Sequence, residues 1–129
     1  NLPIGLLTSS LLFALLHLGN PDIGILPIVN IALFGLFASL YLLQTDNVWG
    51  IIGLHTAWNF TQGNIYGFSV SGTGVDAAVL NFIPKSEWSL LTGGAFGAEA
   101  SIFSSLILLL AVFYLLIKMK KDGSLTELV

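Results

Sequence analysis

The stretch that decides the fold is Ile23–Leu43, with the sequence IGILPIVNIALFGLFASLYLL, in which 21 consecutive residues carry no charge. Two further stretches are almost as apolar. Ala100–Ile117 contains no charged residue, and the only ionisable side chain in Leu2–Leu18 is His17. A helix needs about 20 such residues to cross the hydrocarbon core of a bilayer. The sequence therefore predicts a membrane protein whose long helices lie in lipid.

The overall composition agrees with this prediction. Of the 129 residues, 55% are hydrophobic and only 9% are charged, and the mean hydropathy is +0.91. A soluble domain carries about 25% charged residues. The chain has no cysteine, which excludes disulfides, thiolate metal sites and cysteine nucleophiles. The net charge is −3 and no basic stripe is present, so we expect no nucleic-acid partner.

Turn signals divide the chain into four predicted membrane helices, so the expected fold class is an all-α, polytopic transmembrane helix bundle. Gly19–Asp22 separates the first two helices, and the polar segment Gln44–Asn47 precedes the third. A long glycine-rich connection, residues 63–98, leads to the last helix, and within it Val75–Phe82 is predicted to be a short interfacial helix. The predicted helices cover about residues 3–18, 23–43, 48–62 and 99–117.

The distribution of basic residues predicts the orientation in the membrane. Lys118, Lys120 and Lys121 follow the last predicted helix, whereas the long connection contains only Lys85. Loops rich in lysine and arginine stay in the cytoplasm. We therefore expect a multi-pass integral membrane protein with a cytoplasmic C-terminal tail.

The two histidines are the candidate chemical groups. His17 ends the run Phe13-Ala-Leu-Leu-His17, and His55 opens the run His55-Thr-Ala-Trp-Asn59. Ionisable groups at membrane depth are costly and are retained where they have a partner or a function. Residues four apart share a helix face, so His55 and Asn59 point the same way. Since one spanning helix separates the first helix from the third, these two run parallel, and His17, His55 and Asn59 are predicted to meet at a similar depth.

Two imidazoles and a carboxamide in a dry pocket have three chemical uses. Neutral imidazole nitrogens can bind zinc or haem iron. A histidine can act as a general base toward water. A histidine and an asparagine can donate hydrogen bonds to a developing oxyanion. The residue types alone leave these three uses open.

The motifs also resemble those of a known family. Phe13-xxx-His17, followed by His55-xxx-Asn59, resembles the second and third motifs of the CPBP intramembrane proteases. This family includes the prenyl-protein (CAAX) endopeptidases and the Abi-type bacteriocin-processing and immunity membrane proteins. The segments Gly67–Gly72 and Leu91–Glu99 are similar to it as well. The resemblance covers nearly all of residues 1–129, but only the C-terminal part of the family's domain, so we expect the remainder of the domain upstream.

The resemblance implies an intramembrane endopeptidase that hydrolyses a peptide bond with an activated water. His17 would work with a glutamate of the family's first motif, Glu-Glu-xxx-Arg, while His55 and Asn59 would hold the carbonyl oxygen of the scissile bond. That first motif is absent here, since the chain has no Glu-Glu pair and no arginine. His17 and His55 could instead bind zinc or another divalent metal together with a carboxylate. The implied substrate is a membrane-associated or prenylated peptide, and the implied location is a bacterial plasma membrane.

Two alternative functions are compatible with the same residues. A chain without the paired glutamates could be a non-catalytic scaffold or bacteriocin-immunity protein. His17 and His55 on neighbouring helices could also hold a haem. Glu99 is predicted to cap the last helix, where its charge favours the helix N-terminus, with a role in supporting the site as the alternative.

Overall fold

The computed structural model describes residues 1–83, 85 and 88–124 of the chain. Within these residues the protein is all-helical and contains no strand, which confirms the predicted fold class in its coarse form. Short π- and 3₁₀-helical turns, η1 (Thr61–Ile65), η2 (Gly94–Phe96) and η3 (Ala98–Ala100), complete the structure. The α-helices are α1 (Leu2–Leu15), α2 (Ile25–Thr45), α3 (Val48–Phe60), α4 (Ser89–Thr92) and α5 (Ile102–Lys121).

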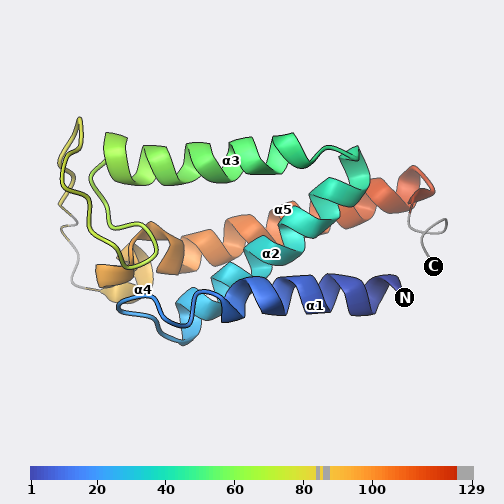
Figure 1. Ribbon diagram of the computed structural model, residues 1–129, viewed down its shortest axis with the longest axis horizontal. Coiled ribbons are helices and arrows are strands. Elements are labelled where there is room, and N and C mark those ends of the chain that lie inside the picture. Colours follow the sequence, from blue (N-terminus) through green and yellow to red (C-terminus); the bar gives the residue numbers. More distant parts are fainter. Residues whose placement is uncertain (84, 86–87, 125–129) are drawn as a thin grey trace.

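The four long helices alternate in direction along the chain (Figure 1). Helices α1 and α3 run the same way, as the sequence predicted, and they form the two outer edges of the view. Helices α2 and α5 run in the opposite direction, and α2 crosses the space between α1 and α3 obliquely. The irregular segments that follow α1 and α3 lie at one end of the bundle, together with α4.

Two of these helices, α2 and α5, are long and apolar enough to cross a membrane. The outward side of α5 is strongly exposed, as Leu110 and Phe113 show with 68% and 62% of their surface accessible. Such a continuous apolar surface needs an apolar environment. Helices α1 and α3 have 14 and 13 residues, fewer than the roughly 20 that span a bilayer. Two candidate spans are therefore present among the described residues, and four spans remain a prediction.

The tightest helix packing joins α2 to its two neighbours. The fully buried Leu40 of α2 lies in one cluster with Val112, Leu115 and Met119 of α5. On the other side of α2, a Cβ atom at Gly35 would lie only 3.0 Å from the Ser10 Cα of α1. The absence of a side chain at this glycine therefore lets α1 and α2 approach closely, as small residues do in membrane bundles.

Helix α3 packs much more loosely. It contains no buried residue. Its start is fixed by Asn47, whose side-chain oxygen accepts hydrogen bonds from the backbone N–H groups of Trp49 and Gly50. The Tyr41 ring of α2 lies against Gly50, where any side chain would collide with it. This helix is therefore held mainly at its N-terminus and by the connection that follows it.

The first helix ends three residues before its predicted end. Leu15 is its last residue, and the His17 N–H group donates to the Ala14 carbonyl at 3.0 Å, a tighter spacing than that of an α-helix. The chain is already turning here toward Gly19 and Pro21. His17 consequently projects from a turn at the end of α1 instead of from the helix itself.

The last helix begins and ends later than predicted. Ser101 is its N-cap, because the Ser101 Oγ accepts a hydrogen bond from the Ser104 N–H at 3.2 Å. The helix continues to Lys121, so that its lysines occupy the final turn. Cations are favourable at that end, where the free carbonyl groups carry partial negative charge.

The predicted helix at Val75–Phe82 is wrong, because this segment has no helical hydrogen bonds of its own. The N–H groups of Val79 and Leu80 instead donate to the carbonyls of Asn64 and Ile65, both at 2.8 Å. These carbonyls lie at the end of η1 and have no partner within it. The connection thus satisfies the backbone of the preceding turn, which a separate helix could not do.

Candidate active site

A cavity of about 210 Å³ lies between α1, α2, α3 and α5. Most of its wall is aromatic or aliphatic, with Phe13, Phe34, Phe37 and Trp58 as the large rings. Its polar side chains come from regions far apart in the sequence. These are His17, Asn30, His55, Ser71, Glu99 and Ser104.

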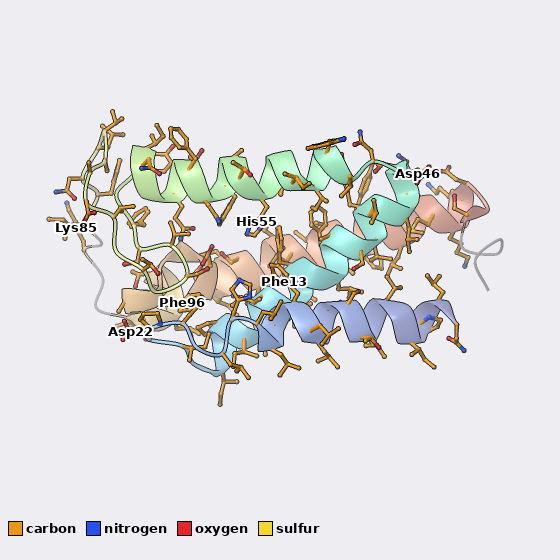
Figure 2. The ribbon with its side chains drawn as sticks, in the orientation of Figure 1. Phe13, Asp22, Asp46, His55, Lys85 and Phe96 are labelled. Carbon is orange, nitrogen blue, oxygen red and sulfur yellow. The ribbon has the colours of Figure 1, made fainter. Side chains whose placement is uncertain are left out.

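Both histidines of the chain reach this cavity and converge on Phe13. The Phe13 ring centroid lies 4.7 Å from that of His17 and 5.9 Å from that of His55. Figure 2 shows His55 pointing from α3 toward Phe13, which points toward it from α1. The Phe34 ring of α2 packs on His55 at 5.0 Å. The structure therefore places His17 and His55 at one cavity, each against the Phe13 ring, whereas Asn59, the third residue of the predicted group, does not line it.

The hydrogen bond of His17 determines which ring nitrogen is available for chemistry. The Nδ1 atom lies 2.7 Å from the Phe13 carbonyl oxygen, which can only accept. Nδ1 must therefore carry the proton in this contact, and Nε2 of the neutral ring carries the lone pair. His17 is thus oriented by the backbone of α1, with Nε2 as its basic atom.

Asn59 lies beside His55 and does not line the cavity. Its Nδ2 atom is 3.5 Å from the His55 Nε2, at the outer limit of a hydrogen bond. The Asn59 Oδ1 is buried and has no hydrogen-bond partner among the described residues. The side chains of His55 and Asn59 thus share one side of α3, as their spacing predicted, with His55 between Asn59 and the cavity.

Glu99 does not cap the last helix, because Ser101 occupies that position and Glu99 belongs to η3. Its Oε2 accepts hydrogen bonds from the Ser71 backbone N–H at 2.8 Å and from the Ser71 Oγ at 2.9 Å. Both residues line the cavity. The alternative interpretation, a role in supporting the site, is therefore the one compatible with this geometry.

Asn30 is a further polar residue of the cavity wall that sequence reasoning did not single out. It is only 2% exposed, and its Nδ2 donates to the carbonyls of Glu99 at 2.7 Å and Ser101 at 3.0 Å. The Ser105 Oγ donates to its Oδ1 at 2.6 Å. Asn30 thereby ties α2 to the turn that carries Glu99. An amide in the middle of the charge-free run Ile23–Leu43 was the available signal, because lipid does not satisfy such a group.

The carboxylate and imidazole groups of the described residues do not form a ready metal centre. No group of three or more histidine, cysteine, aspartate or glutamate side chains within this part of the chain lies close enough to hold a metal ion. Zinc requires at least three protein ligands at bonding distance. Two imidazoles beside a carboxylate can still perform acid–base chemistry on a water molecule.

The comparisons with known proteins concern mainly the part of the chain that carries the two motifs. Residues 1–61 match the family model described as "Type II CAAX prenyl endopeptidase Rce1-like". The match includes α1, α2 and α3, and with them Phe13, His17, His55 and Asn59. Searches of curated proteins and of solved structures found no significant match. Similarity to an endopeptidase family indicates protease-like function in general terms and, together with the two apolar helices, a membrane protein.

Proposed function

We propose that this chain, whose residues 1–61 match the model of the Rce1-like type II CAAX prenyl endopeptidases, forms the histidine-bearing part of an intramembrane endopeptidase. The substrate class is a membrane-associated peptide or protein tail, including prenylated ones. The proposal rests chiefly on one observation. The only two histidines of the chain come from different helices and contact the same Phe13 ring at the wall of one cavity.

We assign the role of general base to His17. Its Nε2 takes a proton from a water molecule, and the water oxygen attacks the carbonyl carbon of the peptide bond. When the C–N bond breaks, the same nitrogen returns the proton to the leaving amine. The hydrogen bond to the Phe13 carbonyl holds the ring in the tautomer that this step requires. A glutamate from the rest of the domain would assist His17, as the family resemblance implies.

We assign oxyanion stabilisation to His55, oriented by Asn59. An N–H group of the imidazole can donate to the carbonyl oxygen as it becomes negative. The phenylalanine rings around His55 exclude water and strengthen this interaction, because electrostatic attraction increases in a medium of low dielectric constant. Zinc bound by His17 and His55 stays a prediction, and such an ion would need a further ligand beyond the described residues.

The proposal is tested by cleavage of a library of membrane peptides by the full-length protein in liposomes. We expect His17→Ala and His55→Ala each to lower kcat/KM by about 10²–10⁴-fold, the usual contribution of general acid–base and oxyanion groups. The exposed neighbours Leu16→Ala and Thr56→Ala are matched controls that we expect to retain activity. Unchanged cleavage by both histidine variants would refute the assignment. No cleavage by the folded wild-type protein would favour the scaffold or immunity function.

No observation favours the haem alternative. The Phe13 side chain contacts both imidazole rings, so it occupies space that a porphyrin between them would need. A Soret band in the purified protein would reverse this conclusion.

A further inference from the structure

Glu99 has one carboxylate oxygen that the protein itself does not use. Its Oε2 accepts both hydrogen bonds from Ser71, whereas no described residue donates to its Oε1. Among the described residues that line the cavity, Glu99 is the only acidic one, and it is partly buried. The free oxygen can therefore accept a hydrogen bond from a molecule that enters the cavity.

Among the described residues no lysine or arginine pairs with Glu99, and the basic group that interacts electrostatically with it is His55. The chain contains four lysines and no arginine. Lys118, Lys120 and Lys121 lie in the last turn of α5, about 25–30 Å from Glu99 along a helix with a rise of about 1.5 Å per residue. Lys85 is exposed and does not line the cavity. The two Ser71 donors bond only one oxygen of the carboxylate, and a cation near the other oxygen would compensate further for the hydration lost beside apolar walls.

Ser71 makes its contact with Glu99 from an unfavourable backbone conformation. Ser71 has a φ of +50°, a left-handed conformation that is unfavourable for residues other than glycine. Gly72 follows with a φ of +81°, and a Cβ atom there would collide with the Pro21 carbonyl oxygen. The turn is thus pressed against the segment after α1 while Ser71 offers both of its donors to Glu99. Local strain of this kind is found where a fold fixes a functional group.

The apolar residues that line the cavity together with Glu99 indicate the shape of the cation that fits. Phe34, Trp58 and Ile107 line the same cavity. Lysine and arginine combine an apolar stem with a charged end, so one side chain can cover such walls and reach a carboxylate. Aromatic faces add attraction for a cation.

The geometry points to Glu99 as a substrate-specificity residue that binds a lysine or arginine side chain of the peptide near its scissile bond. This inference rests on the proposed function, because His17 and His55 share the cavity with Glu99. Ser71 acts through Glu99 as a positioning residue. The two competing roles are assistance to the histidines, and an ion pair with an arginine from another part of the domain.

The test uses two membrane peptides that differ at one position, lysine in one and norleucine in the other. Norleucine keeps the apolar stem and lacks the ammonium group. With the full-length wild-type protein in nanodiscs, we expect kcat/KM to be at least about tenfold higher for the lysine peptide, which corresponds to about 1.4 kcal/mol. We expect Glu99→Gln to bring this ratio close to one, mainly through the KM of the lysine peptide. Ser71→Ala should lower the ratio partially, since the backbone donor remains.

Binding of the same labelled peptides to His17→Ala separates this inference from the proposed function. Cleavage without a preference for lysine would overturn the role of Glu99 and leave the protease assignment intact. A preference in binding that Glu99→Gln removes, without any cleavage by the wild-type protein, would overturn the protease assignment only. If Glu99→Gln slows cleavage of both peptides by the same factor, Glu99 acts in the chemistry or in folding, and the specificity role is wrong.

Discussion

Helices α2 and α5 bury a continuous set of side chains between them, whereas α3 buries none. The first pair contains Leu40 and Met119, both completely inaccessible. On α3, by contrast, Ile52 and Trp58 retain 46% and 43% of their exposure. The difference separates the part of the molecule that supplies stability from the part that carries His55.

This separation has a consequence for the cavity. His17 lies in the turn after α1, which packs closely on α2 at Gly35, and its ring is bonded to the Phe13 carbonyl of α1. His55 is attached to the loosely packed helix. The distance between the two imidazoles therefore depends on how α3 is held against the rest, through Asn47 at one end and the η1 turn at the other. A site between a rigid and a loose element can admit a large substrate by a small movement of one helix.

The largest effect that this comparison predicts is on the free energy of unfolding. Leu40→Ala removes a side chain from the α2–α5 cluster and leaves a cavity, at a cost of about 2–5 kcal/mol. Ile52→Ala on α3 should cost less than about 1 kcal/mol, because much of that side chain is already exposed. Denaturant unfolding of the full-length protein in detergent measures both. An equally large loss for Ile52→Ala would mean that another part of the protein packs on α3.

Two glycine substitutions test the same comparison between α2 and α3, and they should change the free energy of unfolding by an intermediate amount. Gly35→Ala places a Cβ atom 3.0 Å from the Ser10 Cα, so α1 and α2 must separate, which costs about 1–3 kcal/mol. At Gly53 on α3 no atom lies within 4 Å of an added Cβ. Gly53→Ala should therefore stabilise the protein by up to about 1 kcal/mol, because alanine favours the helix. Thermal unfolding of the two variants should shift the midpoint in opposite directions, and a shift in the same direction would contradict the comparison.

The sequence alone predicted the parts of the structure that depend on local pattern. The charge-free length of Ile23–Leu43 was sufficient for α2, which the structure places at Ile25–Thr45. The order of helices was sufficient to bring His17 and His55 to one cavity, since the first and third helices of an alternating bundle run parallel. Spacing of four residues placed Asn59 beside His55.

The contacts that complete the cavity were not predictable in this way. The bond between Ser71 and Glu99 joins residues 28 positions apart and requires a left-handed backbone at a serine. Asn30 reaches the turn near Glu99 across 69 positions. Neither contact corresponds to a periodic pattern of residues in the sequence, because each depends on how irregular segments fold back on the bundle. Their only signals were polar residues in places where no local partner exists.

The smallest predicted effect is on the local stability of the first turn of α3. Asn47→Ala removes the side-chain acceptor of the Trp49 and Gly50 N–H groups, at a cost of about 1 kcal/mol. A helix with few tertiary contacts depends on such local interactions, so the first turn of α3 should open more often. Hydrogen exchange at these two amides should become faster, while Thr45→Ala, a control at the end of α2, should not change it. Unchanged exchange in Asn47→Ala would mean that contacts other than the cap, such as that between Tyr41 and Gly50, hold this end of α3.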